Sequence, residues 1–333
     1  MSRQRIRGIF ATAAFALLVW IALSAGPTFG SFTQTGANSG NSFTAASDFF
    51  RFASGSYTGN GASGRAITGV GFKPGLVLIK ANATSAGVGR TSTMSGDATK
   101  PLSGGTALTA GQIQSLDSDG FTIGTNASVN TSGTTYQWAA FESGRELKVG
   151  SYTGNGAATR SITGFGFQPE LVAVLPASAQ IAVLRATGMT TSFAFGSNAG
   201  AASQINSLDA DGFTVGNSAS TNTSGTAYHY VAFNDATGTS KSGSYAGNAL
   251  DNTNITGVGF QPKFVLVRGA DTLTSRRTIW RTNSLSGDSS MSFTGVAFAA
   301  NQIQSFLSDG FQVGTDGNVN ALAITNYYLA ITG

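Results

Sequence analysis

Hydrophobic and polar positions along the chain follow one pattern three times. The phrase Gly55–Asn60 (GSYTGN) returns at Gly150–Asn155 and at Gly243–Asn248, which gives spacings of 95 and 93 residues. A second phrase, Ile67–Pro74 (ITGVGFKP), returns in step with the first, and an apolar run follows it in each copy. Each copy then closes on an aromatic-rich stretch, at residues 136–141, 228–233 and 326–331. Matching phrases in a fixed order at a nearly constant spacing indicate three internal repeats.

Each copy has the pattern of short strands joined by tight turns. The continuous apolar run Leu76–Lys80 predicts a strand that is buried on both faces. Ile113–Ser118 and Phe121–Gly124 flank Asp119-Gly120, which predicts a two-residue hairpin turn. The spacing of 93–95 residues exceeds the roughly 20–50 residues of solenoid and propeller repeats. Each copy is therefore long enough to be a domain of its own. The sequence therefore predicts an all-β protein with three tandem antiparallel β-sandwich (jelly-roll-like) domains after an N-terminal signal helix.

The first 30 residues have the layout of a secretory signal peptide. A short basic stretch, Met1–Arg7, precedes the apolar run Gly8–Ala25, and small residues follow. The alternative is an uncleaved membrane anchor, for which this run is at the short limit. Both readings place the rest of the chain outside the cytoplasm, so we expect a secreted or cell-surface protein that meets the membrane only through its export signal. The predicted organisation is a signal peptide (1–30), a linker or donor-strand-like segment (31–54) and repeats at 55–149, 150–242 and 243–333.

The net charge of the chain beyond its export segment argues against nucleic acid as a partner. Three of the 19 basic residues, Arg3, Arg5 and Arg7, lie in the export segment, which leaves 16 basic and 15 acidic residues beyond residue 30. A chain so close to neutrality carries no electrostatic footprint for nucleic acid. There is no cysteine, which excludes disulfides, thiolate nucleophiles and cysteine-ligated metals.

Candidate catalytic groups are scarce. His229 is the single histidine, and no phrase of the nucleophile-elbow type supplies a serine partner, so we expect an ordinary strand residue there. The chain is therefore predicted not to be an enzyme and to need no cofactor. A glycan hydrolase that uses paired aspartates is kept only as an outside alternative.

Two of the hairpins carry paired carboxylates. Asp117 and Asp119 belong to the first copy, and Asp209 and Asp211 to the second. Alternation along a strand places both members of a pair on one face, which makes weak calcium binding the metal hypothesis. The simpler interpretation is a hairpin whose Asp-Gly pair supplies the turn geometry.

Aromatic and arginine positions recur in register and are the candidate ligand-binding residues. If alternate residues of each closing strand point to the core, the remaining aromatic rings face outward or toward a neighbouring repeat, and flat rings with a polar group suit stacking on sugars or proteins. An arginine in the strand after each apolar run would add hydrogen-bond donors to such a binding face. The candidates are Tyr136, Trp138, Tyr228, Tyr230, Tyr328, Arg90, Arg185 and Arg281. Core packing or a contact between repeats is the alternative.

The aligned phrases resemble a domain of phage tail-fibre and tail-associated proteins. The resemblance rests on GSYTGN, on ITGVGF and the apolar run after it, on the DSDGF hairpin and on the closing Tyr136-Gln-Trp138 strand, and it covers residues 55–333. It implies a β-sandwich module at receptor-facing or structural positions. The third copy departs most, with Leu307 in place of the first hairpin aspartate and Asn326 in place of the first closing tyrosine.

Residues 30–45 are similar to the mature N-termini of TasA/camelysin-type exported proteins, through the phrase Gly40–Ala45 (GNSFTA). That resemblance implies assembly into surface fibres by strand donation. The sequence therefore leaves two functions open. The first is adhesion by non-catalytic repeats that bind an extracellular glycan or surface protein, with avidity from repetition. The second is a structural subunit that self-assembles by strand addition through Ser31–Ala45.

Overall fold

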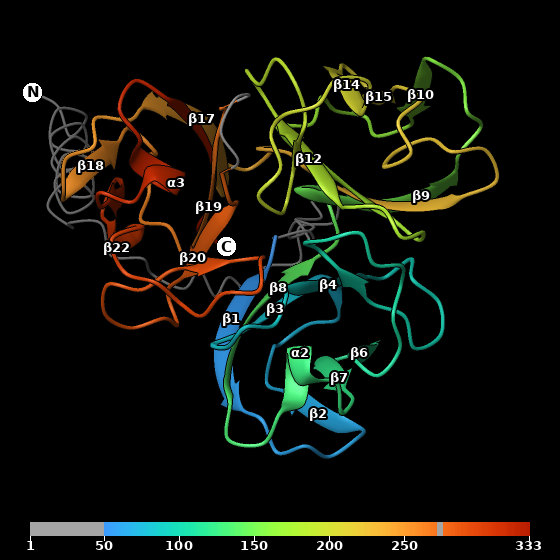
Figure 1. The fold of residues 1–333 in the computed structure, drawn as a ribbon, viewed down its shortest axis with the longest axis horizontal. Helices are drawn as coiled ribbons and strands as arrows, with labels where there is room; N and C mark the ends of the chain where they lie inside the picture. The colour runs from blue at the N-terminus through green and yellow to red at the C-terminus, as the bar shows by residue number, and fades with distance from the viewer. Residues whose placement is uncertain (1–49, 272–275) are drawn as a thin grey trace, which may run out of the picture. The chain divides into compact units, whose positions relative to one another are not determined.

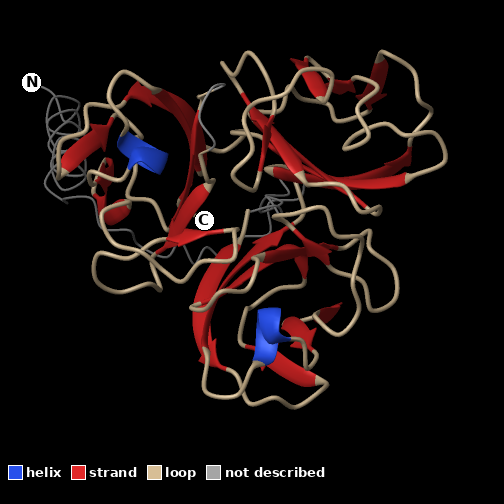
Figure 2. Ribbon diagram, viewed as in Figure 1, coloured by secondary structure: helices blue, strands red, loops and turns tan. Residues whose placement is uncertain are grey.

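The computed structural model describes residues 50–271 and 276–333, and these residues form strands, turns and two short helices (Figures 1 and 2). The predicted export segment and the phrase Ser31–Ala45 lie outside the described residues. In the described part, no helix combines the length and the apolar character that crossing a membrane requires.

Every repeat consists of two antiparallel sheets, one with five strands and one with three, and this confirms the predicted all-β fold of tandem sandwiches. In repeat 1 the five-stranded sheet has the order β1-β8-β3-β4-β5 and the three-stranded sheet the order β2-β7-β6. The elements are β1 (Phe52–Thr58), β2 (Arg65–Thr68), β3 (Pro74–Ala81), β4 (Val88–Thr91), β5 (Lys100–Pro101), β6 (Ile113–Asp117), β7 (Gly120–Ile123), the short helix α2 (Ala127–Asn130) and β8 (Thr135–Glu142).

Repeats 2 and 3 have the same topology. Repeat 2 contains β9 (Leu147–Thr153), β10 (Arg160–Thr163), β11 (Leu171–Pro176), β12 (Val183–Ala186), β13 (Phe193–Ala194), β14 (Ile205–Asp209), β15 (Gly212–Val215) and β16 (Ala227–Phe233). Repeat 3 contains β17 (Ser240–Ala246), β18 (Thr253–Thr256), β19 (Phe264–Gly269), β20 (Ile279–Thr282), β21 (Met291–Ser292), β22 (Ile303–Leu307), β23 (Gly310–Val313), α3 (Gly317–Asn320) and β24 (Thr325–Ile331).

The first strand of each repeat begins before its predicted domain boundary. β1, β9 and β17 start three residues ahead of Gly55, Gly150 and Gly243, because the polar phrase GSYTGN forms only the end of an edge strand. Within residues 50–271 and 276–333, apolar contacts and hydrogen bonds join all three repeats, which therefore pack on one another.

The hairpin between β6 and β7 differs in detail from the prediction. Asp117 pairs with Gly120, so the two-residue loop is Ser118-Asp119 and the glycine is already a strand residue. Gly120 has φ +141°, and a Cβ there would lie 2.0 Å from the carbonyl oxygen of Ile67 on β2. Glycine is therefore required by the close approach of a backbone rather than by a turn of the expected type.

Inside each repeat, the two sheets enclose a core of their own. All eight residues of β3 are buried, as its apolar run predicts. The core of repeat 1 is built from one face of β3 and β8, with Val77, Ile79 and Trp138, against Phe121 of the small sheet. Corresponding residues form the cores of repeats 2 and 3.

The other face of each five-stranded sheet is covered by the neighbouring repeats. One apolar cluster takes residues from all three copies, among them Phe141, Phe233 and Phe264, and a small cavity of about 30 Å³ at its centre is lined by apolar side chains alone. Phe141 contacts both Phe233 (ring centroids 5.6 Å apart) and Phe264 (5.2 Å). The large sheet of each repeat is thus buried on both faces.

Polar contacts around this cluster run in cyclic order. One position of the closing strand, Gln137, His229 or Tyr327, reaches the same loop position of the adjacent repeat each time. The three contacts are Thr93 Oγ1 with His229 Nδ1 at 2.8 Å, Tyr327 Oη donating to the Gly188 carbonyl at 2.7 Å, and Ser284 Oγ donating to Gln137 Oε1 at 2.9 Å. Repeats 1 and 2, 2 and 3, and 3 and 1 therefore meet through equivalent surfaces, and the three copies close a ring.

Candidate functional site

The closing-strand aromatics form parts of cores, so the alternative of core packing is confirmed and an exposed binding face on these residues is wrong. Tyr136 and Tyr228 are fully buried, and Trp138, Tyr230 and Tyr328 are 6–7% exposed. The alternation predicted for the strand is present, but the face opposite the sandwich core packs on other repeats instead of meeting solvent. Trp138 packs edge-on against Phe121, with ring centroids 5.7 Å apart, and fills the space above Gly55.

The two fully buried tyrosines also satisfy backbone groups at the end of the sandwich. The Tyr136 hydroxyl donates to the Ala127 carbonyl at 2.8 Å and accepts from the Thr131 amide at 2.7 Å. Tyr228 makes the same two bonds in repeat 2. Their rings stack on Tyr57 and Tyr152 of the first strands, at 5.1 and 5.2 Å. These positions are structural.

The recurring arginines hold loops and are not free donors. Arg90 is 6% exposed, and its guanidinium donates to the carbonyls of Met94 (3.0 Å), Gly96 (2.6 Å), Ile113 (3.1 Å) and Ala98. Arg281 repeats this pattern in the third copy, and Arg185 donates to two carbonyls in the second. Burial lowers the pKa of all three. Each arginine ties the loop after its strand to the small sheet.

The hairpin aspartates are explained without a metal. Asp119 accepts hydrogen bonds from the amides of Gly69 (3.1 Å) and Gly71 (2.6 Å), and these bonds lower the pKa of its carboxyl. Asp211, and Asp309 in repeat 3, make the same pair of bonds. The glycine phrase therefore presents two amides to one carboxylate.

The first aspartate of each pair binds hydroxyl groups. Asp117 accepts from Ser115 and Thr122, both at 2.8 Å, and Asp209 accepts from Thr214 at 2.6 Å. Both carboxylates therefore hold the side chains of their own hairpins. Over residues 50–271 and 276–333, no group of three or more acidic or histidine side chains is placed to hold a metal ion.

His229 joins repeats 1 and 2. Burial and the nearby Arg90 lower its pKa, and Thr93 is its hydrogen-bond partner. Its position on β16 thus places the ring in the contact between these two repeats.

Two open hollows lie beside predicted binding residues, Arg281 in repeat 3 and Arg185 in repeat 2, while the other residues that line them were not predicted. In repeat 3 a hollow of about 500 Å³ is lined by Gln261, Pro262, Lys263, Arg281, Asn283, Leu285, Ser305, Phe306 and Thr332. Its rim is exposed at Gln261 and Asn283, while Phe306 is half-buried. The lining combines apolar side chains, Leu285 and Phe306, with polar groups of the kind that orient ligands.

Repeat 2 has a hollow of about 240 Å³ at the same place. Six of its positions are equivalent in register to those of repeat 3, namely Gln168, Arg185, Thr187, Met189, Ser207 and Leu208. In both hollows the glutamine amide donates to the carbonyl across the opening, that of Leu208 (2.9 Å) or Phe306 (3.4 Å). The signal available in the sequence was this glutamine, which stands where repeat 1 has Lys73.

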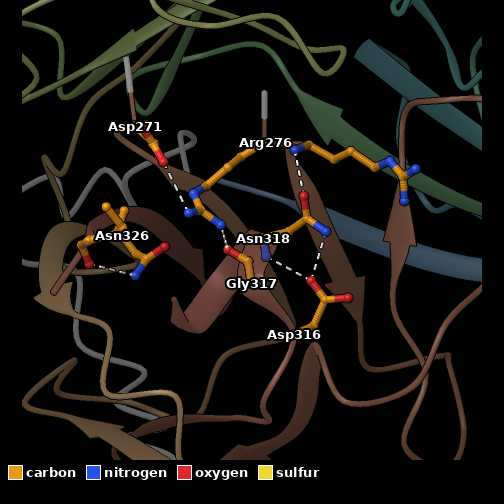
Figure 3. Close-up of polar contacts among 8 residues, drawn as sticks. Asp271, Arg276, Asp316, Gly317, Asn318 and Asn326 are labelled. Carbon is orange, nitrogen blue, oxygen red and sulfur yellow. Dashed lines mark hydrogen bonds and ion pairs between the residues drawn. The ribbon is translucent and has the colours of Figure 1, made fainter. Parts of the chain in front are cut away.

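Repeat 3 also holds a polar cluster that the other copies lack (Figure 3). Asn326 stands at the position of Tyr136, and the loop between the β19 and β20 strands is three residues longer than its counterparts. Arg276 from this loop pairs with Asp271 (3.0 Å) and donates to the carbonyl of Gly317. Gly317 is the register equivalent of Ala127, so a guanidinium donates here where a tyrosine hydroxyl donates in repeat 1.

The cluster continues into the cap of α3. Asp316 accepts from the amide and the side chain of Asn318, both at 2.7 Å, and Asn318 accepts from the amide of Arg277 at 2.7 Å. A Cβ on Gly269 would lie 2.8 Å from Cδ of Arg276, so glycine makes room for the arginine stem. The cluster is thus a local rebuilding of the sandwich end.

Comparison with known proteins yields one family. No curated protein and no solved structure matches the chain. A family model matches residues 45–146 and 194–332, which covers repeat 1, the second half of repeat 2 and repeat 3, and its description is a domain of unknown function, DUF7483. Since the two segments make up most of the chain, the protein belongs to the DUF7483 family.

Proposed function

We propose that this chain is a non-catalytic binding protein of extracellular surfaces that holds a surface polymer, a glycan, in the hollows of its repeats. The observation that carries the proposal is the recurrence of one hollow at equivalent positions of repeats 2 and 3. Each hollow has an exposed amide at its rim and an apolar side chain, Phe306 or Leu208, in its wall. Weak sites held in one unit gain affinity for a repeating polymer through effective concentration.

Location outside the cytoplasm is part of this proposal. It rests on the signal-like residues 1–30 and is tested by sequencing the N-terminus of the exported protein. The resemblance to tail-fibre modules points in the same direction, toward a receptor-facing role.

The experiment is glycan-array binding followed by titration with the best polymer. In the double variant Gln168→Ala and Gln261→Ala, each hollow loses its rim amide. Loss of one hydrogen bond of about 1 kcal/mol predicts a roughly five-fold weaker Kd at each hollow. Gln180→Ala is the matched control, because Gln180 is exposed and lies outside both hollows. Equal binding by wild type and the double variant, or no binding to any glycan, would contradict the proposal.

A second candidate function is self-assembly by strand addition. The edge strands β6, β14 and β22 of the small sheets are half-exposed, and unpaired edges are templates for an added strand. Deletion of residues 31–45 then leaves monomers where the full mature chain forms filaments. Filaments that persist after the deletion would exclude Ser31–Ala45 as the donor.

A further inference from the structure

The ring of repeats has one interface that no connector crosses. Residues 143–146 join repeats 1 and 2, and residues 234–239 join repeats 2 and 3. Repeats 3 and 1 meet at what is here called the seam. Its polar contacts are Ser54 Oγ donating to Asn283 Oδ1 (2.9 Å), Ser284 Oγ to Gln137 Oε1 (2.9 Å), the Gly87 amide to the Phe293 carbonyl (2.8 Å) and the Phe298 amide to Asn82 Oδ1 (3.0 Å).

The seam lacks a feature that the other two interfaces share. Lys100 of repeat 1 donates across to the carbonyls of Ser178 (2.9 Å) and Gln180 (2.6 Å) in repeat 2. Arg268 of repeat 3 donates across to the carbonyls of Gly196 (3.1 Å) and Asn198 (2.5 Å) in repeat 2. Charged donors make the stronger hydrogen bonds.

Lys80 is the residue of repeat 1 equivalent to Arg268, but it bonds within its own repeat. Its ammonium donates to the carbonyls of Ala81 (2.5 Å) and Ala83 (3.0 Å). Among the described contacts, no charged side chain bonds across the seam. The seam is therefore held by apolar packing and neutral hydrogen bonds.

The apolar side chains on both sides of the seam nevertheless need to stay buried from water. Phe264 of repeat 3 packs on Phe141 at 5.2 Å and on Phe52 at 5.9 Å, and all three rings would meet water if the ring opened. The interface is head-to-tail, so the surface of repeat 3 that fits repeat 1 of its own chain fits repeat 1 of any copy.

The connector allows such an exchange. Residues 234–239 are half-buried or exposed, and six extended residues span about 20 Å. We propose that repeat 3 is exchanged between two copies of this chain, with residues 234–239 as the hinge. Repeat 3 of each chain closes the ring of the other, so both the seam and the Arg268 contacts of repeat 3 with repeat 2 then form between chains. A swapped dimer carries twice the number of repeats, all with the same contacts as in the monomer.

The test uses the absence of cysteine from the chain. Ser54→Cys with Asn283→Cys places a reactive pair across the seam, and Ser92→Cys with Val149→Cys is the matched control at the equivalent positions between repeats 1 and 2. Each variant of residues 31–333 is refolded at high concentration, monomer and dimer are separated by size exclusion, and each fraction is treated with a short bismaleimide. Denaturing gels then report whether the link joins one chain or two.

In the dimer fraction, we expect the seam pair to give two-chain products and the control pair to give one-chain products. In the monomer fraction, both pairs give one-chain products. One-chain products from the seam pair of a dimer would overturn the proposal, and two-chain products from the control would overturn the hinge at 234–239. Failure of any dimer to form would also overturn it.

A second variant keeps the test independent of refolding yield. Deletion of Ala236–Gly238 leaves a three-residue connector, and shortening a hinge favours exchange. We expect the dimer fraction of freshly purified protein to rise at least ten-fold. An unchanged monomer with wild-type stability would contradict the proposed hinge.

Discussion

The same end of the sandwich is built in two ways in repeats 1 and 3. In repeat 1, Tyr136 fills the space and its hydroxyl satisfies Ala127 and Thr131. In repeat 3 a small asparagine takes the tyrosine position, and Arg276 enters from a longer loop to donate to the equivalent carbonyl. The difference shows that the fold specifies a volume and a donor at this point and leaves open which residue supplies them.

The largest expected effect on stability comes from replacing the buried tyrosine of repeat 1. Tyr136→Asn imitates repeat 3 but provides no arginine, because the loop of repeat 1 is shorter. A ring-sized cavity and unsatisfied backbone groups should lower the free energy of unfolding by about 3–5 kcal/mol. Urea denaturation measures this, and Tyr230→Phe, which removes a hydroxyl that makes no hydrogen bond to the described residues, is the control. A loss below 1 kcal/mol would contradict the role given to Tyr136.

The next effect concerns a second difference between these repeats, at Lys80 and Arg268. Burial lowers the pKa of Lys80, and of Lys100 at the interface with repeat 2, from 10.5 to about 8. Between pH 8 and 10.5 these two lysines bind more protons in the unfolded chain than in the native one, so their contribution to stability rises with pH over this window. Between pH 8 and 10 the gain is about 2 kcal/mol per lysine.

Above pH 10 the trend reverses, because burial raises the pKa of Tyr57, Tyr152 and Tyr245, which ionise first in the unfolded chain. Urea midpoints at pH 8, 9 and 10 test the rise, and Lys80→Met should remove about half of it. Stability that is flat or falls over this window would contradict the burial of both lysines.

A smaller effect is expected in repeat 3. Arg276→Ala leaves the Gly317 carbonyl without its guanidinium donor and costs about 1–2 kcal/mol. Adding Asn326→Tyr to this variant restores the arrangement of repeat 1 and should recover most of the loss. Asn326→Tyr alone should destabilise, because ring and arginine compete for one space above Gly269. Additive losses in the double variant would show that the two residues do not share that space.

The smallest effect on stability is expected at the hairpin aspartate that recurs in every repeat. Asp119→Asn and Asp309→Asn remove a carboxylate that binds two glycine amides in each copy, and both should lower the Tm slightly and equally. The depressed pKa of these carboxyls means that their contribution is present above pH 4 and is lost as pH falls through the native pKa. Asp251→Asn, at an exposed site of repeat 3, is the control.

The fold was largely predictable from the sequence. Repeats, apolar runs and turn residues give short antiparallel strands, because alternation and β-branched content act locally. The burial of the expected binding residues was not predictable. Alternation along the closing strand shows that Trp138 and Phe141 lie on opposite faces and that both faces are apolar, but it does not show what covers each face. Phe141 meets Phe233 and Phe264 from other repeats, and such contacts leave no local pattern. The hollows depend on Gln168 and Gln261, single differences inside a repeated phrase.

The second face of each large sheet is buried between repeats, so the three copies should unfold as one unit. Differential scanning calorimetry of residues 50–333 tests it most directly, by comparing the calorimetric with the van't Hoff enthalpy. If the three copies unfold together, a single transition is expected in which the two enthalpies agree. Separate transitions, or a van't Hoff enthalpy near one third of the calorimetric value, would mean that the repeats unfold independently and would contradict it.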